Sequence, residues 1–431
     1  MSSGHFLFLD FISPWVVWSP RRAGKNEAET PGSRFLKNQT LLIQAEGTMK
    51  RIRLIFLAMG SILIVQMGLA DWTPSRRLTW TAGASPVPQI AVDSIGIIHL
   101  VWPDYTPGSP EIYYRRSKDK GSTWTTKQRL TWTSSDSLYA VIAADTSSRI
   151  HMVWQDMTSD NCDLYFKRST NAGGSWSTGQ RLTWTSGYSF APAIAVDSPD
   201  GIHVVWQDDS PGNDEIYYKQ STDAGVAWST SKRLTWTSGE SRLPDVAADS
   251  LGTLHVVWYD GTPGNDEIYY KRSTDGGATW STSQNLTLAV GACREPAIAV
   301  DPSGTLHLVW DSITPGDWEI YHKKSTDGGA TWSVNQRLTW TSGHSYAPSI
   351  AADSSGNLHV VWYDDQPGNF EVYYKNSTDG GATWSASQRI SWNSGRSEYP
   401  VITADASGNL HVAWDDDTPG NYEIYYKKNA H

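Results

Sequence analysis

The segment PDVAADSLGTLHVVWYDGTPGNDEIYYKRSTDGGATW occupies residues 244–280 and contains three runs typical of β-strands. These runs, at residues 244–249, 253–258 and 267–273, are separated by stretches that contain Gly, Pro, Asn or Asp. Pro-Gly and Asp-Gly-Gly mark turns, because Pro sets the φ at which a turn begins and Gly tolerates a positive φ. A fourth run begins at Asn285. The segment therefore predicts four short antiparallel strands.

The same segment recurs along the chain with a period of 52 residues. Its histidine, His255, has a counterpart in every repeat, and each of these histidines is followed three residues later by Trp. The tryptophan that ends the segment recurs as Trp124, Trp176, Trp228, Trp280, Trp332 and Trp384. A strict period of this length predicts a propeller or another repeat array. Four short strands form one blade, which buries its faces only against neighbouring blades.

The two ends of the repeats favour a closed ring over an open array. The last repeat ends after its third strand, at EIYYKKNAH, whereas residues 71–80 (DWTPSRRLTW) provide a fourth strand alone. We therefore predict an all-β fold for residues 71–431. It is a seven-bladed β-propeller of four-stranded antiparallel blades, with the ring closed by the N-terminal strand completing the last blade. Residues 76–81 should pair with 423–427, and Trp80 should be buried there, so that a Trp80→Asp change destabilises the ring.

A targeting signal precedes the repeats. From Met49 the chain carries a basic stretch, a mostly apolar run at residues 54–69 and a small-x-small motif at residues 68–70. The run is shorter than the roughly 20 residues that a membrane-spanning helix needs. We predict a Sec-type signal peptide at residues 49–70 and a secreted, extracellular or periplasmic product. Residues 1–48 lack periodicity, and we interpret them as a non-structural extension from a mis-assigned gene start.

Composition excludes several classes of protein. The chain has 431 residues and a net charge of −10, which argues against nucleic-acid binding because phosphates need a basic face. Its 23 Trp, 20 Tyr, 36 Gly and 21 Pro suit strands and turns. The two cysteines, Cys162 and Cys293, lie in blades three steps apart, so we predict that both are free thiols. We expect a monomer.

A further motif, S-x-D-x-G-x-[TA]-W, lies between the third and fourth strand runs. Its copies begin at Ser117, Ser221, Ser273, Ser325 and Ser377, with a degraded copy at Ser169. The Asp accepts backbone hydrogen bonds, Gly takes a left-handed conformation and Trp packs beneath. These motifs resemble Asp-boxes, the bacterial neuraminidase repeats (BNR) of sialidase-like propellers, and the resemblance covers residues 71–431. It implies Asp-boxes on the face opposite the usual ligand site, as a mark of the fold rather than of catalysis.

The resemblance also implies what a sialidase would need: an arginine triad, a tyrosine nucleophile paired with Glu, and an acid/base Asp. The first triad arginine of sialidases lies in an R-I-P motif on an inner strand. Here Arg242-Leu243-Pro244 and Arg294-Glu295-Pro296 occupy that position in two adjacent blades. No second or third triad arginine can be assigned, and sialidases have six blades rather than seven. Both departures weaken the enzymatic interpretation.

Two repeated polar series raise the question of metal binding. The seven histidines are spread around the ring, whereas metal ligands converge within about 2 Å of one ion, so we interpret them as packed structural residues. Aspartates that follow the second-strand Trp by two residues lie in turns, and residues 415–417 (Asp-Asp-Asp) could partly coordinate calcium. The alternative is that each Asp caps its own turn. We predict no metal or other cofactor, with calcium as the alternative.

Positions that differ between repeats are the candidates for ligand binding, because the blade itself does not require them. They cluster before the first strand and after the second, and both connections open on one face around the central channel. Such a mouth with aromatic rings and charges suits a sugar or peptide, although drift of exposed loops would give the same pattern. The predicted ligand-binding residues are Arg242, Arg294, Asp311, Trp318, Tyr346, Glu398 and Tyr399. The two arginines would bind the carboxylate of an acidic ligand.

These observations favour a non-catalytic binding module for glycans or for cell-surface or extracellular proteins. Near-identical blades distribute similar surfaces around the ring, whereas catalysis needs one asymmetric group of residues. The alternative is a glycoside hydrolase of sialidase-like type, an exo-alpha-sialidase, for which Asp311 and Glu398 would supply the two carboxylates.

Overall fold

The computed structural model describes residues 72–429 except 159–160, 198–199, 263, 289–290 and 314–315. These residues form an all-β structure of strands β1 to β28, and no helix occurs among them. The predicted signal peptide at residues 49–70 and the extension at residues 1–48 lie outside the described residues.

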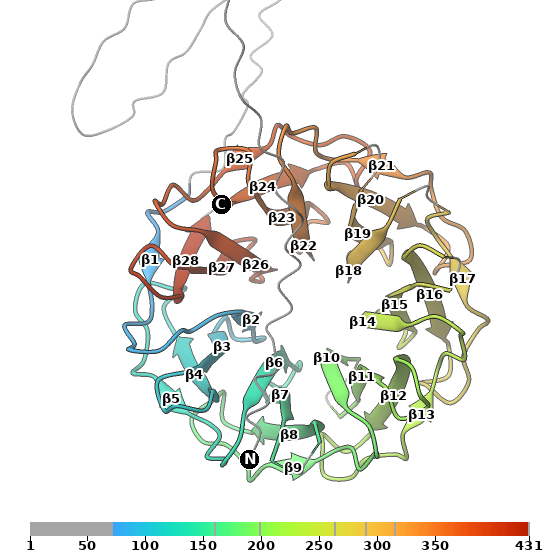
Figure 1. Cartoon of the computed structure of the whole chain (residues 1–431), viewed down its shortest axis with the longest axis horizontal. Helices are drawn as coiled ribbons and strands as arrows, with labels where there is room; N and C mark the ends of the chain where they lie inside the picture. The colour runs from blue at the N-terminus through green and yellow to red at the C-terminus, as the bar shows by residue number, and fades with distance from the viewer. Residues whose placement is uncertain are drawn as a thin grey trace, which may run out of the picture. The chain divides into compact units, whose positions relative to one another are not determined.

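Seven four-stranded antiparallel sheets are arranged in a ring as the blades of a β-propeller (Figure 1). Blade 4 is formed by β14 (Ser241–Ala248), β15 (Leu254–Asp260), β16 (Glu267–Ser273) and β17 (Gln284–Asn285). Blades 1 to 3 are β2 (Gln89–Val92), β3 (Ile98–Asp104), β4 (Glu111–Ser117) and β5 (Gln128–Arg129); β6 (Ser137–Ala144), β7 (Ile150–Asp156), β8 (Asp163–Ser169) and β9 (Gln180–Arg181); and β10 (Ser189–Val196), β11 (Ile202–Asp208), β12 (Glu215–Ser221) and β13 (Lys232–Arg233). Blades 5 to 7 are β18 (Cys293–Val300), β19 (Leu306–Ser312), β20 (Glu319–Ser325) and β21 (Gln336–Arg337); β22 (Ser345–Ala352), β23 (Leu358–Asp364), β24 (Glu371–Ser377) and β25 (Gln388–Arg389); and β26 (Ser397–Ala404), β27 (Leu410–Asp416), β28 (Glu423–Asn429) and β1 (Arg76–Arg77).

The two ends of the described chain close the ring, as predicted. In blade 7, β1 pairs with β28, with Arg76 opposite Tyr426 and Arg77 opposite Tyr425. Trp72 forms a further bridge to Asn429. Figure 1 shows β1, in blue, beside β28, in red. The ring therefore leaves no blade with three strands.

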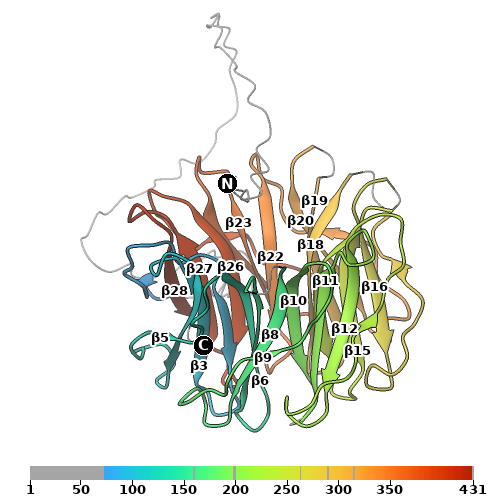
Figure 2. The same cartoon turned by 60° about the horizontal axis from the view of Figure 1, so that its bottom comes forward.

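Successive turns alternate between two opposite faces of the ring. Asp260 lies opposite both Ser241 and Glu267, so the connection from β15 to β16 and the start of β14 share one face. The Asp-box turn after Ser273 lies on the other face, which we call the Asp-box face. Figure 2 shows the strands crossing the thickness of the ring between these faces.

The Asp-boxes join neighbouring blades. The Asp275 carboxylate accepts hydrogen bonds from Thr279 Oγ1, and from Thr279 N and Ser273 Oγ at 2.8 Å each, and these contacts lower the pKa of Asp275 to about 2. Gly277 has a φ of +87°, and a Cβ there would lie 2.0 Å from the Tyr218 hydroxyl of the preceding blade. The motif Trp packs edge-on against the same third-strand ring position, with centroids 5.0–5.2 Å apart in blades 1 to 7.

The repeated histidines are structural, which agrees with the sequence interpretation. His99 is fully buried, and its Nδ1 lies 2.7 Å from Tyr114 Oη while its Nε2 lies 3.3 Å from Asp93 Oδ2. Burial lowers the pKa of His99, so the ring is neutral in the folded protein. In blades 2 and 5 the tyrosine is replaced by Phe166 and His322.

The prediction that Trp80 is buried is wrong. Trp80 is 66% exposed, whereas Leu78 is 1% exposed. The fourth strand ends at Arg77, and Leu78 N donates a 2.7 Å hydrogen bond to Ile424 O as the chain leaves the strand. Leu78 therefore takes the inward position and Trp80 lies beyond it. The thiol prediction is confirmed, since Cys162 and Cys293 are both buried and free.

Candidate functional site

In blades 2 to 7 the inner strand begins with a bulge, and the left-handed residue at this position is present in all seven blades. In blade 4 the register shifts between Arg242 and Asp245, and Leu243 between them has a φ of +45°. The residues with positive φ at this position are Val87, Tyr139, Ala191, Leu243, Glu295, Ala347 and Tyr399. Left-handed backbone costs roughly 1–3 kcal/mol per non-glycine residue and collects at functional sites.

A side chain from the preceding blade caps the bulge in four of these positions. Ala347 N donates to Asp311 Oδ2 at 3.2 Å, and Val87 N donates to Asp415 Oδ2 at 2.8 Å. The amides of Leu243 and Ala191 donate in the same way to Gln207 and Gln155. Each capping residue follows the second-strand Trp directly. Asp311, predicted as a ligand-binding residue, therefore also holds two blades together.

Aromatic side chains from blades 5, 6 and 7 form a continuous patch above these bulges. The ring centroid of Tyr346 lies 5.8 Å from that of Trp318, 5.6 Å from Tyr363 and 6.2 Å from Phe370. Tyr363 in turn lies 5.5 Å from Tyr399. Burial raises the pKa of Tyr346 and Tyr399, so both hydroxyls stay protonated at neutral pH.

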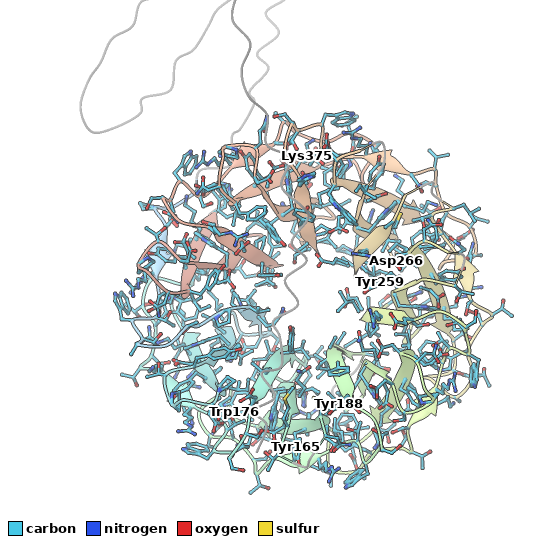
Figure 3. The ribbon with its side chains drawn as sticks, viewed as in Figure 1. Tyr165, Trp176, Tyr188, Tyr259, Asp266 and Lys375 are labelled. Carbon is cyan, nitrogen blue, oxygen red and sulfur yellow. The ribbon has the colours of Figure 1, made fainter. Side chains whose placement is uncertain are left out.

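The two predicted arginines lie in adjacent blades, and each contacts a carboxylate from the blade before. Arg242 Nε donates to Asp214, and its Nη2 lies 2.8 Å from Glu240 Oε2. Arg294 Nε donates to Asp266 Oδ2 at 2.6 Å, and its guanidinium lies 5.7 Å from the centroid of the Trp318 ring. Figure 3 shows Asp266 and Tyr259 beside the central opening. An acidic ligand must therefore compete with these aspartates.

Carboxyl groups lie beneath the aromatic patch. Burial raises the pKa of Asp311 well above its usual range, and neighbouring Glu295, whose pKa is also raised by burial, adds to the effect. Within the described residues, neither Glu295 Oε2 nor Asp311 Oδ1 has a donor, and a proton shared between the two carboxyls would satisfy both. Burial also raises the pKa of Glu398, which accepts a 2.7 Å hydrogen bond from Tyr422 Oη.

The structure thus brings together six of the seven predicted residues, all but Arg242, which lies one blade away. We call this group, with three neighbours, the axial cluster. Its members are Arg294, Glu295, Asp311, Trp318, Tyr346, Tyr363, Phe370, Glu398 and Tyr399. Glu295, Tyr363 and Phe370 were not among the predicted ligand-binding residues. Their signal was present, since all three differ between repeats, Glu295 before the first strand and Tyr363 and Phe370 after the second-strand Trp.

Two crevices lie elsewhere, at the Asp-box turns between blades. One is lined by Tyr114, Arg116 and Gly173, and the other by Tyr426 and Gly121 among others. In both, the third-strand tyrosine of one blade meets the Asp-box glycine of the next. These crevices are a consequence of blade packing, and we do not assign them to the candidate site.

The predicted calcium alternative falls on aspartates that are already hydrogen-bonded. Asp260 Oδ2 accepts from Ser241 Oγ at 2.7 Å and Asp260 Oδ1 accepts from Thr262 N at 2.8 Å. Asp416 has the same two kinds of partner, Ser397 and Thr418. In the part of the chain that the structure describes, no three His, Cys, Asp or Glu residues are grouped to hold a metal ion.

The seven-bladed ring and the Asp-boxes define a sialidase-like β-propeller. Two family models match the sequence: the BNR repeat-like domain over residues 216–414 and the BNR repeat-containing family member over residues 83–246. The chain belongs to the BNR-repeat propellers. No curated protein sequence matches it significantly. Within the described residues, no helix is long and apolar enough to cross a membrane.

Several solved structures share this fold. A protein of unknown function from Dyadobacter fermentans is 14% identical with a TM-score of 0.53, and the match covers 83% of this chain and 99% of that one. Hadza microbial sialidase Hz136 is 17% identical with a TM-score of 0.50, over 74% and 73% of the two chains. An α-L-arabinofuranosidase from Fusarium graminearum is 12% identical with a TM-score of 0.50, over 80% and 92%. At these identities the likeness shows the fold alone.

Proposed function

We propose that this protein is a secreted, monomeric, non-catalytic propeller that binds glycans at the axial cluster. The observation that carries the proposal is the continuous aromatic patch around Tyr346, which three blades supply together. The C–H faces of sugar rings pack well on aromatic faces, while tyrosine hydroxyls and carboxyls nearby supply hydrogen bonds to sugar hydroxyls. Binding needs no metal in this proposal, so chelation with EDTA leaves it unchanged.

The polar residues of the cluster favour binding over catalysis. Arg242 and Arg294 are paired with Asp214 and Asp266, whereas a sialidase would use such arginines for the substrate carboxylate. Burial and neighbouring carboxyls raise the pKa of Tyr399, which works against a tyrosine nucleophile. These features support recognition of a glycan without cleavage.

A glycan array followed by calorimetry tests the proposal. We expect the purified protein to bind a defined group of glycans, and Tyr346→Ala to weaken that binding by at least about tenfold, the loss of one stacking contact. Leu138→Ala is the matched control, since Leu138 occupies the corresponding strand position in blade 2. Equal binding by both variants, or binding only to an extracellular protein, would contradict the proposal.

The second candidate is a glycoside hydrolase, and the Glu295–Asp311 pair is the observation that favours it. A carboxyl with a raised pKa beside a second carboxyl is the arrangement a general acid needs. Fluorogenic sialosides and arabinofuranosides test this activity. Turnover that Glu295→Gln abolishes, without loss of glycan binding, would establish the hydrolase and overturn the non-catalytic proposal.

A further inference from the structure

Six tryptophans lie exposed at the same position of six blades, each six residues before the inner-strand position at which the axial cluster has Arg294, Tyr346 and Glu398. We call them the rim tryptophans, and each is between 62% and 69% exposed. They are Trp80, Trp132, Trp184, Trp236, Trp340 and Trp392. Each follows an outer strand by three residues, in the connection that leads to the next inner strand. They therefore lie at the outer ends of connections whose inner ends carry the axial residues.

The blades do not need these rings for their cores. The leucine two residues earlier takes the buried position: Leu234 is 2% exposed, whereas Trp236 is 67% exposed. Blade 4 has Leu288 in place of the tryptophan and still forms its four strands. Single exposed apolar side chains are common on protein surfaces, but six indoles at one equivalent position form a regular series of aromatic surfaces around the ring.

Each ring is held in place by cations of the scaffold. At Trp236, the Arg233 guanidinium lies 5.6 Å from the ring centroid and Lys271 Nζ, from the next blade, also lies at 5.6 Å. Trp132, Trp184 and Trp340 have the same arginine and lysine pair. Figure 3 shows Lys375, the lysine at Trp340, toward the outside of the ring. Such cation–π contacts orient the ring before a ligand arrives, which lowers the entropy lost on binding.

These cations are already satisfied by the protein itself. Arg233 Nε donates to Thr235 O at 2.6 Å and Arg233 Nη2 donates to buried Glu215 at 2.7 Å. Lys271 Nζ donates to Leu234 O. The Arg233 charge is paired with Glu215, and Lys271, which is 8% exposed, directs its ammonium group to a backbone carbonyl. The exposed part of each site is therefore the indole face, on a protein whose net charge is negative. This combination selects an uncharged ligand with an apolar face and polar edges, which describes a neutral sugar ring.

We infer that the rim tryptophans are a second set of binding sites, which bind a neutral polysaccharide by stacking one sugar ring on each indole. A single contact of this kind is weak, with a dissociation constant of about 1 mM. Linked sugars that reach two or more sites bind with an avidity higher by about 10²–10⁴-fold. The ring of equivalent sites therefore favours a polymer over a short oligosaccharide. This inference does not depend on the axial cluster.

Affinity electrophoresis through gels containing soluble mixed-linkage β-glucan, galactomannan or xylan tests the inference. We expect at least one of these polymers to slow the wild-type protein. Trp132→Leu, Trp236→Leu and Trp340→Leu together should weaken the apparent affinity by at least about tenfold, because fewer linked sites remain. Unchanged unfolding midpoints would establish that the triple variant is folded.

Two control variants distinguish binding at the rim tryptophans from other causes of retention. Val334→Ala removes an exposed apolar side chain on the Asp-box side of blade 5 and should leave retention unchanged. Leu251→Ala, which removes an exposed apolar side chain from the turn between β14 and β15, should also leave it unchanged. Retention by none of the polymers, equal retention of the triple variant, or an equal loss of retention in either control would overturn the inference. So would a wild type that self-associates through these tryptophans in sedimentation experiments and gives no retention as the separated monomer.

Discussion

At the residue scale, one buried position differs between repeats in a way that affects the stability of the fold. In blade 1 the third-strand Tyr114 lies 2.7 Å from His99 Nδ1, and in blade 2 the corresponding residue is Phe166. His151 Nδ1 consequently has no hydrogen-bond partner among the described residues, although the ring is fully buried. A buried polar atom without a partner lowers the stability of the fold.

We predict that Phe166→Tyr stabilises the protein by about 1 kcal/mol, the usual gain from one buried hydrogen bond. The new hydroxyl reaches His151 Nδ1 in the way that Tyr114 reaches His99. Denaturant unfolding at pH 7 measures the change. Tyr114→Phe should show the opposite change, and a destabilised Phe166→Tyr would contradict the interpretation.

Two adjacent glycines of one Asp-box should respond differently to a methyl group. Gly277→Ala places Cβ 2.0 Å from the Tyr218 hydroxyl, so we expect a loss of about 3 kcal/mol or more from strain and overpacking. Gly276 has no atom within 4 Å of such a Cβ, and alanine already occupies this position as Ala172 and Ala224. Gly276→Ala should therefore cost no more than about 1 kcal/mol. Equal losses in thermal unfolding would show that the close approach to Tyr218 is unimportant.

At the element scale, the inner-strand bulge connects the fold with the candidate site. The side chain that caps the bulge comes from the second strand of the preceding blade, as Asp311 does for Ala347 and Gln207 does for Leu243. The comparison of the repeats predicted that variable positions precede the first strand. It did not predict the left-handed residue, because Leu243 and Ala347 have no local preference for a positive φ. The capping contacts enforce that conformation across a blade boundary.

The raised pKa values of Asp311 and Glu295 should make stability depend on pH. Burial raises the pKa of Asp311 and Glu295 in the folded protein, so the folded state holds a proton that the unfolded state has lost. Stability should therefore fall as pH rises from about 4 toward and through the raised pKa. Asp311→Asn supplies an amide donor to Glu295 and keeps an acceptor for Ala347 N. Unfolding free energies measured from pH 4 to 9 should decline less steeply in Asp311→Asn, and identical slopes would contradict a shared proton.

At the scale of the whole molecule, the 52-residue period and the split last blade were sufficient to predict a closed seven-bladed ring. Those signals are local: strand runs, turn residues and a constant spacing. The burial of Trp80 was wrong, because the outer strand ends at Arg77 and leaves the inward position to Leu78. The pairing of Arg242 with Asp214 could not be predicted either, since it joins the inner strand of one blade to a loop of the blade before.

Ring closure predicts that Leu78 contributes much more to the stability of the protein than Trp80 does. Leu78 is 1% exposed in a core that also contains Ile424 and Tyr426 from the other end of the chain. Leu78→Ala should therefore destabilise the protein by about 2–5 kcal/mol. Trp80→Ala, at an exposed position with one cation–π contact, should cost less than about 1 kcal/mol. Denaturant unfolding with intrinsic fluorescence compares the two variants. A larger loss of stability for Trp80→Ala would contradict the assignment of Leu78, rather than Trp80, to the core where the two chain ends meet.

The most direct test of the central claim is a crystal structure of the protein with the glycan that binds best on an array. The proposal predicts an intact glycan with a sugar ring stacked on the patch formed by Trp318, Tyr346 and Tyr363, within reach of Glu398. A glycan bound only on the Asp-box face, or one whose glycosidic bond has been cleaved at Glu295 and Asp311, would contradict a non-catalytic binding site at the ring axis.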